Sequence, residues 1–228
     1  MSDTALVVGA SRGIGLGLAR ELLERGWQVT GTVRDPDAAA PLAEAGATVA
    51  VVDVADPDAP AALGAALGAD PGARTLDVLL LNAGVTGPAH QSADRVTAEE
   101  LGALFLVNAA APVRLARALF DRVRPGGVVA FTSSSMGSVA GNRSGDMELY
   151  RASKAALNSL VRGFAATSGR DDVAILVLHP GWVRTEMGGP HAPLDVATSA
   201  RDLAGVIERH RGTGRHAFVD HTGAELPW

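Results

Sequence analysis

Cysteine is absent from the 228-residue sequence, which excludes disulfide bonds, thiolate zinc sites, iron–sulfur clusters and a cysteine nucleophile. Long apolar runs are also missing: runs such as 78–81 and 173–178 are far shorter than the ~20 residues of a membrane helix. Residues 1–11 lack the basic segment and the apolar stretch of a signal peptide. We therefore expect a soluble, cytoplasmic protein that makes no membrane contact.

Charge of one sign is not concentrated anywhere in the chain. The 20 Lys and Arg and 25 Asp and Glu residues give a formal net charge of −5, and no basic block is present, which argues against nucleic-acid binding. The six histidines form no metal-binding motif, so we expect no metal site. Apolar residues make up 47% of the chain and charged residues 20%, which suits one compact domain and not a disordered chain.

Short apolar runs alternate with longer amphipathic segments, and continuous apolar strands are typical of a parallel sheet covered on both faces. We predict one α/β domain over residues 1–228, a Rossmann-like doubly wound sheet of about seven parallel strands in the order 3-2-1-4-5-6-7, with helices on both faces. The predicted strands are 6–8, 29–33, 49–54, 78–81, 128–131, 174–178 and 217–219. The predicted helices are 14–23, 38–45, 59–67, 97–124 with a kink near Pro112, 149–167 and 199–209.

A glycine-rich loop follows the first predicted strand, with Gly9, Gly13 and Gly15 in the spacing G-x-x-x-G-x-G. Glycine allows a tight turn and a close approach to a pyrophosphate, and the following helix presents free N–H groups and the positive end of its dipole. Alone, the loop could be an ordinary turn, but the strand before it and the helix after it favour a dinucleotide site. The predicted phosphate-binding residues are Gly9, Ser11, Arg12, Gly13, Ile14 and Gly15.

The end of the second predicted strand indicates which dinucleotide binds. An NAD site places an acidic side chain there to accept hydrogen bonds from the ribose hydroxyls. Val33 occupies this position instead, and Arg34 follows it. Arginine can pair with a 2′-phosphate through a charge-assisted fork, and Arg12 could reach the same phosphate. Asp35 is acidic and adjacent, and Arg34 with Asp35 could be a solvated turn, but the pattern favours NADP.

Tyr150 and Lys154 are the only tyrosine and the only lysine of the chain, and they lie four residues apart in a predicted helix. Their side chains therefore share one helix face. Carbonyl reduction needs an acid that protonates oxygen while hydride reaches carbon, and a phenol with a pKa of about 10 is weak for this at neutral pH. A nearby ammonium and a positive nicotinamide ring favour the phenolate and lower that pKa. An ordinary helix with an exposed lysine is the alternative.

Three serines, Ser133, Ser134 and Ser135, follow the fifth predicted strand. Ligands bind at the carboxyl ends of the strands in such a sheet, so a hydroxyl there could donate to a substrate carbonyl. A loop or a helix cap is the alternative interpretation of a serine run. The residues alone leave open which serine would act.

Taken in order, these motifs resemble one family, the short-chain dehydrogenases/reductases, over essentially the whole chain. The pieces are GASRGIG at 9–15, Asp53 after the third strand, NAG at 82–84, Asn108 in the long helix, SSSMG at 133–137, YRASK at 150–154 and HPGWVRTEM at 179–187. Within the family, the stretches 137–158 and 222–228 are similar to the sniffer-like carbonyl reductases and bacterial C-factor relatives.

The resemblance implies a role for each residue. Tyr150 would be the general acid/base, Lys154 would lower its pKa and bind ribose, and Ser134 would polarise the carbonyl. Asn108 would support a helix distortion and a water that relays protons towards Lys154. The implied contacts to the rest of the cofactor come from Asp53, Val54, Asn82, Ala83, Gly84, Pro180, Gly181, Val183 and Thr185.

The resemblance thus implies an NADP(H)-dependent oxidoreductase that transfers hydride between the nicotinamide and a small-molecule carbonyl or alcohol substrate. The same fold permits a non-catalytic NADP-binding regulator or signalling factor. An acyl-carrier-protein ketoreductase is a third reading, for which the sequence localises no basic docking patch.

Only a short segment separates the motif at 179–187, which follows the sixth predicted strand, from the predicted helix 199–209. This short segment predicts an open site for a small or exposed carbonyl. The apolar side chains that could line it are Met136, Met147, Trp182 and Met187. Family members are often dimers or tetramers, so we expect a homo-oligomer that uses the two long helices. Leu226 and Trp228 would either join that interface or fold back on the core.

Overall fold

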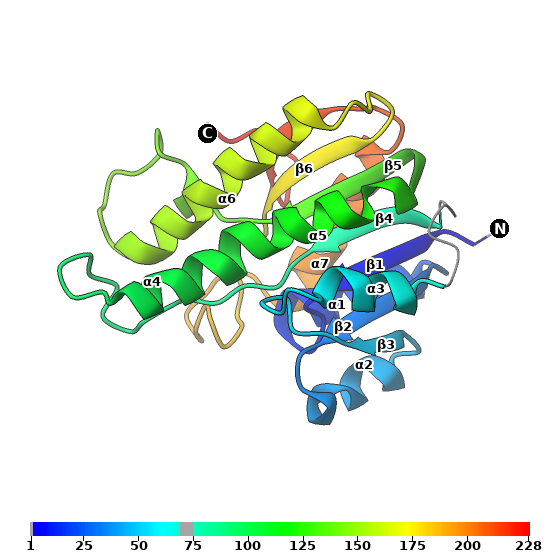
Figure 1. Ribbon diagram of the computed structural model, residues 1–228, viewed down its shortest axis with the longest axis horizontal. Helices are drawn as coiled ribbons and strands as arrows, with labels where there is room; N and C mark the ends of the chain where they lie inside the picture. Colours follow the sequence, from blue (N-terminus) through cyan, green and yellow to red (C-terminus); the bar gives the residue numbers. More distant parts are fainter. Residues whose placement is uncertain (1, 69–74) are drawn as a thin grey trace.

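Seven parallel strands form the centre of the structure, a computed structural model that describes residues 2–68 and 75–228 (Figure 1). They pair in the order β3-β2-β1-β4-β5-β6-β7, which confirms the predicted sheet. The strands are β1 (Thr4–Val8), β2 (Gln28–Val33), β3 (Thr48–Val51), β4 (Leu76–Leu81), β5 (Val123–Thr132), β6 (Ala174–His179) and β7 (His216–Asp220). The helices are α1 (Gly13–Glu24), α2 (Ala40–Glu44), α3 (Ala59–Ala66), α4 (Ala98–Phe105), α5 (Ala111–Leu119), α6 (Glu148–Thr167) and α7 (Val196–His210).

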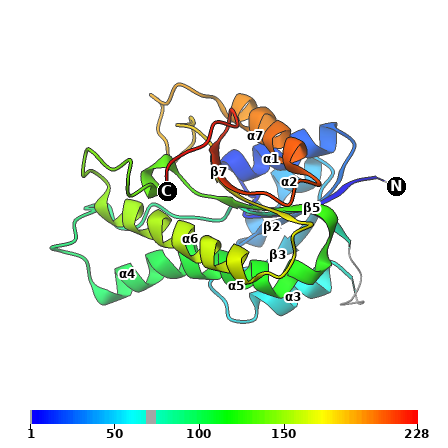
Figure 2. The same ribbon diagram turned by 90° about the horizontal axis from the view of Figure 1, so that it is seen from above.

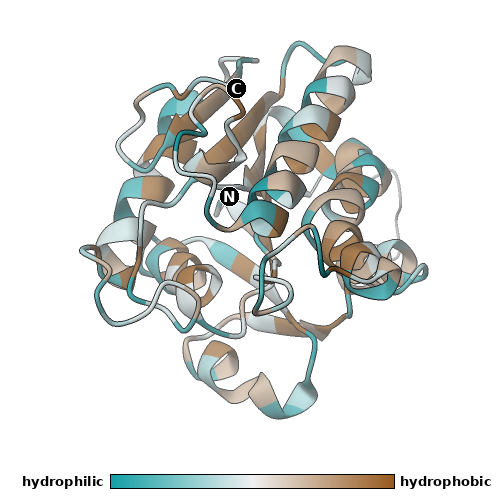
Figure 3. Cartoon of the chain, turned by 90° about the vertical axis from the view of Figure 1, so that its left-hand side faces the viewer, coloured by the Kyte–Doolittle hydropathy of each residue, from teal (hydrophilic) through white to brown (hydrophobic). Residues whose placement is uncertain are grey.

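Successive strand residues point into two separate cores. In β1, Leu6 and Val8 belong to the cluster under α3, α5 and α6, whereas Ala5 and Val7 belong to the cluster under α1, α2 and α7. Figure 2 shows these two helical layers on opposite sides of the sheet. Figure 3 shows the strands mostly in hydrophobic colours and the loops paler or hydrophilic. Burial on both faces is the reason that the strands are continuously apolar in sequence.

Strand β5 is longer than the sequence predicts, because it begins at Val123 and not at residue 128. The glycines that follow Pro125 suggest a turn, yet the chain continues through them as an irregular part of the strand. The register against β4 shifts between Leu76 and Val78. A Cβ on Gly127 would lie 2.6 Å from Cγ1 of Val123, so the irregularity needs glycine at this position.

The predicted long helix is divided, and its interruption lies before Pro112 and not at it. Between α4 and α5 the chain makes one π-helical turn, η2 (Leu106–Ala110), and a 3₁₀ turn, η3 (Phe120–Arg122), ends the segment. Pro112 falls in the first turn of α5, where a missing N–H is tolerated. The distortion is therefore centred on Asn108, and π turns of this kind occur often at functional sites.

The segment Ala98–Arg122 is long and apolar enough to span a membrane by length and composition alone. More than half of its most apolar window is buried within the molecule. Its inward side chains, among them Leu115 and Leu119, belong to the core that α5 shares with α6. These contacts identify the segment as a core helix of the fold.

The C-terminal segment folds back on the core. The indole of Trp228 lies 5.5 Å from the ring of Phe218 and 5.1 Å from that of His216, between ring centres. The guanidinium of Arg162 in α6 lies 4.8 Å from the same indole. Of the two alternatives for this tail, the structure shows the second.

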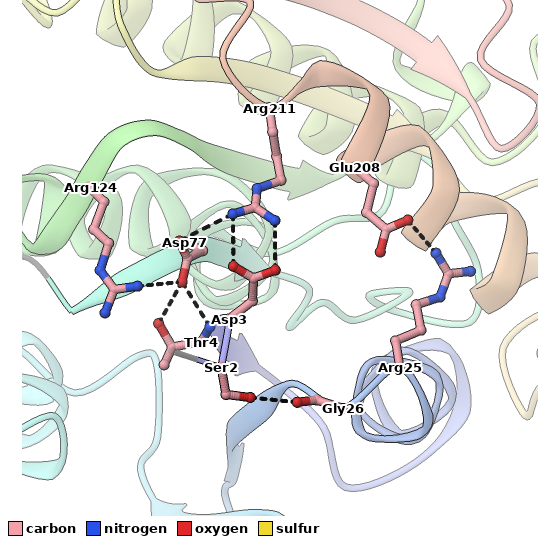
Figure 4. Close-up of polar contacts among 9 residues, drawn as sticks. All are labelled: Ser2, Asp3, Thr4, Arg25, Gly26, Asp77, Arg124, Glu208 and Arg211. Carbon is pink, nitrogen blue, oxygen red and sulfur yellow. Dashed lines mark hydrogen bonds and ion pairs between the residues drawn. The ribbon is translucent and has the colours of Figure 1, made fainter.

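A network of charged side chains joins the amino ends of β1, β4 and β5 to the end of α7 (Figure 4). Buried Asp77 accepts hydrogen bonds from Arg124 at 2.8 Å, from Arg211 at 3.3 Å and from the N–H of Thr4 at 2.8 Å. Arg211 also forms two hydrogen bonds with Asp3, which hold the pKa of that carboxyl below its usual value. The network ties four elements together at the edge opposite to the carboxyl ends of the strands.

We expect Asp77→Ala to lower the free energy of unfolding by about 2 kcal/mol or more. The substitution removes a buried acceptor shared by two guanidinium groups and by the N–H of Thr4. Urea denaturation followed by circular dichroism measures the change.

Glu225→Ala is the matched control, because Glu225 pairs with Arg215 where both side chains are exposed. Its expected effect is within about 0.5 kcal/mol. Equal losses in the two variants would show that burial of the Asp77 network adds nothing to stability.

Candidate active site

The polar and glycine-rich residues predicted to bind ligands follow strand ends at one edge of the sheet. Because the strands are parallel, their carboxyl ends share that edge. These positions are Gly9 after β1, Arg34 after β2, Asp53 after β3, Asn82 after β4, Ser133 after β5 and Pro180 after β6. The fold thus brings residues that are far apart in sequence to a common edge, opposite to the charged network.

Gly9 and Gly15 give the loop after β1 its shape. Gly9 has a φ of +84°, and a Cβ there would lie 2.7 Å from the Cα of Ala83. A Cβ on Gly15 would overlap the main-chain oxygen of Gly9, which accepts a hydrogen bond from Nδ2 of Asn82 at 2.8 Å. A larger residue at either position would push the loop away from the end of β4. The glycine loop and the NAG segment are therefore packed directly on one another.

Among the described residues, no side chain caps the N-terminus of α1. Arg12 is its N-cap residue, and the Arg12 side chain makes no hydrogen bond to the first turn. Arg12 instead forms an exposed ion pair with Glu186, from the segment after β6. The methyl group of Thr185 lies 3.4 Å from the position of a Cβ on Gly13. The segment after β6 therefore covers the glycine loop, as the predicted cofactor contacts require.

Main-chain geometry fixes the start of that covering segment. Gly181 has a φ of +83°, and Pro180 accepts a hydrogen bond from the Ser199 hydroxyl at 2.7 Å. Val183 is buried and forms a β-bridge with Leu194. The first bond ties Pro180 to α7, and the bridge ties Val183 to the residues just before that helix. The chain then continues to Thr185 beside the glycine loop.

The ends of β2 and β3 carry the residues predicted to contact the adenosine half. Arg34 is exposed directly after β2. The Asp35 carboxylate accepts the N–H two residues on, at 3.0 Å, and so caps the short helix η1 (Pro36–Ala38). Asp53 makes the same kind of turn after β3 at 2.9 Å, and Val54 is buried beside it. The acidic group next to Arg34 is therefore engaged by its own backbone.

Lys154 is buried, and its ammonium group donates to the main-chain oxygen of Thr132 at 2.9 Å. Its Nζ lies 5.8 Å from the centre of the Tyr150 ring and 3.4 Å from the position of a Cβ on Gly84. Burial lowers the pKa of Lys154 to about 8, because it disfavours the charged form. The amine thus stands between Tyr150 and the strand end that packs on the glycine loop.

The pKa of Tyr150 is raised to about 12. Burial is the larger cause and raises it, whereas a hydrogen bond with the Ser134 side chain acts in the opposite direction. The Ser133 hydroxyl turns away and donates to Oδ1 of Asn158 at 2.7 Å. Ser135 is exposed in the 3₁₀ turn η4 (Ser135–Gly137). Ser134 caps η4, since its hydroxyl accepts the N–H of Met136 at 3.1 Å, and of the three serines it is the one that acts on the pKa of the phenol. Protein atoms alone keep Tyr150 in its neutral, proton-donating form at neutral pH.

Asn108 is completely buried in the π turn η2. Its Oδ1 accepts from the N–H of Val85, and its Nδ2 donates to the Val85 oxygen, both at 2.8 Å. Nδ2 also donates to the Ser153 hydroxyl at 3.0 Å, and Oδ1 lies 3.3 Å from the position of a Cβ on Gly84. The helix interruption thus presents Asn108 to the end of β4 and to α6, next to Lys154. Its part in a proton relay stays a prediction.

The sequence does not reveal Gln91 as a site residue. Its side-chain oxygen accepts the N–H of Tyr150 at 3.0 Å, across 59 positions of the chain. Its amide nitrogen donates to the main-chain oxygens of Thr86 and Pro88, each at 2.8 Å. A lone glutamine in a polar loop carries no pattern that predicts a contact with a distant helix, and only the tertiary structure shows it.

The loops that follow β5 and β6 rise from the carboxyl edge, on the left in Figure 1. Trp182 and Met187 are exposed there, whereas Met136 and Met147 are half-buried. The indole N–H of Trp182 donates to the main-chain oxygen of Gly188 at 2.8 Å, which holds the exposed ring in place. The four residues predicted to line a substrate site thus form apolar surface on both loops.

Comparison with known proteins places this arrangement among characterised relatives. The family model for short chain dehydrogenase matches residues 3–193. The C-signal protein of Myxococcus xanthus is 39% identical over 155 residues, which cover 67% of this chain and 93% of that protein. A carbonyl reductase from Pseudomonas aeruginosa PAO1, solved in complex with NADP, is 46% identical with a TM-score of 0.90, and the match covers 100% of both chains. The carbonyl reductase Sniffer of D. melanogaster is 29% identical with a TM-score of 0.85, again over 100% of both chains.

Proposed function

Because the chain belongs to the short-chain dehydrogenase family, we propose that it is an NADP(H)-dependent oxidoreductase that acts on a small carbonyl or alcohol substrate. The observation that carries the proposal is the place of buried Lys154, whose Nζ lies 5.8 Å from the centre of the Tyr150 ring and 3.4 Å from the position of a Cβ on Gly84. Lys154 approaches Gly84, and the neighbouring Ala83 packs on the glycine loop. Acid, amine and phosphate-binding loop therefore lie next to one another at one edge of the sheet.

The residues at this edge fit a dinucleotide. The uncapped first turn of α1 and the loop 9–15 would hold the pyrophosphate. The turn at 53–54 and the main chain of 82–84 would hold the adenosine half, while Lys154 and the segment 180–185 would hold the nicotinamide half. The bound NADP in the P. aeruginosa carbonyl reductase, 46% identical over the whole chain, supports this assignment.

The exposed arginine directly after β2 would bind the 2′-phosphate of NADP. Arg34 has the charge and the planar fork that a phosphate requires, and Arg12 offers a second guanidinium from the glycine loop. Asp35 would be the residue to select NAD, but its carboxylate caps η1. The end of β2 therefore favours NADP over NAD.

When bound, NADPH supplies the hydride that reaches the carbonyl carbon. Tyr150 donates its phenolic proton to the carbonyl oxygen, and Ser134 donates a hydrogen bond to the same oxygen and orients it. Lys154 is mostly protonated at pH 7 with a pKa of about 8, so its positive charge stabilises the phenolate that remains. In alcohol oxidation, the Tyr150 phenolate would accept the hydroxyl proton, and bound NADP⁺ would take up the hydride from the carbon.

Apolar surface beside the site supports an apolar carbonyl compound as substrate. Trp182 and Met187 are each more than half exposed, on the loop that covers the glycine loop. When an apolar ligand covers large exposed apolar side chains, the burial of both surfaces makes binding more favourable. A small or exposed carbonyl on an apolar body matches this surface.

The outer face of α5 and α6 supports an assembly of identical chains. It forms a shallow, mainly apolar groove, in which Leu160 is 43% exposed. The groove is lined by Ala110, Val113, Arg114, Arg117, Ala118 and Leu160. A homo-oligomer that pairs this face is part of the proposal.

A non-catalytic NADP-binding signalling factor is the second candidate. The name C-signal of the M. xanthus relative favours it. The half-buried phenol of Tyr150, with the Lys154 amine 5.8 Å from its ring centre, argues for the enzyme, because a pure regulator has no use for an acid beside an amine. The two candidates differ in whether NADPH is consumed.

Oxidation of NADPH, followed by its absorbance with a panel of aldehydes, ketones and quinones, tests the proposed function. We expect turnover with at least one apolar carbonyl compound, and a loss of roughly 10²–10⁴-fold in kcat for Tyr150→Phe, which keeps the ring and removes the proton donor. NADPH affinity of that variant should stay within about twofold. Intact NADPH binding without turnover on any compound would favour the regulator, and unchanged turnover in Tyr150→Phe would refute the acid.

Arg34→Ala tests the choice of cofactor. We expect its Kd for NADPH to rise roughly 10–100-fold and its Kd for NADH to change less than about threefold, because only NADPH carries the 2′-phosphate. Asp35→Ala, which removes the η1 cap and keeps the arginine, is the control and should retain the preference for NADPH. Equal losses for both cofactors in Arg34→Ala would show that the arginine does not read the 2′-phosphate.

A further inference from the structure

Two residues other than glycine have a left-handed backbone conformation within residues 2–68 and 75–228. Both adjoin the start of α6. Gln91 has a φ of +50° and Met147 a φ of +53°. Met147 is the N-cap residue of α6, and Gln91 contacts the first turn of that helix. Non-glycine residues keep this conformation only where surrounding contacts enforce it, and they cluster at functional sites. Contacts outside the helix therefore fix the geometry at its start.

Gln91 supplies the cap that α6 lacks. The side chain of Met147 makes no hydrogen bond to the first turn, so the N–H groups there need other acceptors. The N–H of Tyr150 donates to Oε1 of Gln91 at 3.0 Å. The group that receives this cap belongs to the proposed acid itself.

The rest of the same side chain holds its own loop in shape. Nε2 of Gln91 donates to the main-chain oxygens of Thr86 and Pro88, both at 2.8 Å. A second contact joins this loop to α6, because the N–H of Ala93 donates to Oε2 of Glu148 at 2.9 Å. The loop begins directly after the NAG segment at the end of β4. The start of α6 is thus tied to the strand end that packs on the glycine loop.

We propose that Gln91 is a positioning residue for Tyr150. It holds the phenol close to Ser134, on the side of α6 where the dinucleotide would lie. This inference rests on the proposed function. Glutamine suits the task because one amide group carries both the acceptor for Tyr150 and the donors for the loop carbonyls. Alanine and glycine supply neither.

Gln91→Ala and Gln91→Gly test this role together, since both remove the amide and glycine also accepts a φ of +50° without strain. For both variants we expect kcat to fall roughly 10-fold or more while NADPH affinity stays within about twofold. Tyr150 is the only tyrosine, so tyrosinate absorbance reports its ionisation without a substrate. With NADP⁺ bound, its midpoint should move by roughly half a pH unit or more from that of the unaltered protein, because a displaced phenol changes both its burial and its hydrogen bond with Ser134, the two causes that set its pKa.

Thr97→Ala is the matched control, because it removes the capping box of the neighbouring helix α4. Its kcat should stay within about twofold and its tyrosinate midpoint should not move.

Equal effects in the Thr97 and Gln91 variants would show that Gln91 acts only as a helix cap. A defect in Gln91→Ala that Gln91→Gly lacks would assign the effect to strain. Either result overturns the inference. Full activity in both Gln91 variants with an inactive Tyr150→Phe rejects only this inference, whereas an active Tyr150→Phe rejects the proposed function.

Discussion

The burial of the Lys154 ammonium is the constraint on which the carboxyl edge of the sheet depends. An amine removed from water needs an acceptor, and the Thr132 main-chain oxygen provides one at the end of β5. Gly84, three residues after the end of β4, faces the amine, and a Cβ there would lie 3.4 Å from it. Asn108 approaches the same position to 3.3 Å from a π turn, and both ends of its amide are bonded to Val85. Strand ends, helix interruption and glycine are thus arranged around one positive charge.

The two edges of the sheet carry different kinds of ion pair. At the amino edge, Asp77 is buried between arginines from β5 and α7, and its loss is costly. At the carboxyl edge, Arg12 and Glu186 are both exposed, so their pair is weak and screened by salt. That pair joins the glycine loop to the segment that covers it. The fold is therefore tied firmly at the amino edge and only weakly across the edge where the glycine loop lies.

Much of the fold and part of the site follow from the sequence, for reasons that particular residues show. Continuous apolar strands such as β4 identify a doubly covered parallel sheet, and the spacing of Tyr150 and Lys154 places them on one face. The glycine spacing likewise predicts the loop that packs on Ala83. The length of β5 was mispredicted, because Gly126 and Gly127 look like a turn in sequence. The resemblance of SSSMG to the family motif selects Ser134 from the three serines, whereas the cap from Gln91 depends on a tertiary contact that no local pattern records.

The pKa of Tyr150, read from the tyrosinate absorbance of the only tyrosine during a pH titration, tests this arrangement most directly. In the protein alone the midpoint should lie well above the ordinary 10.0, towards about 12, because burial dominates. With saturating NADP⁺ the midpoint should fall, since the positive nicotinamide ring and the Lys154 ammonium both stabilise the phenolate. A midpoint that does not respond to NADP⁺ would contradict a shared site for the phenol, the amine and the dinucleotide.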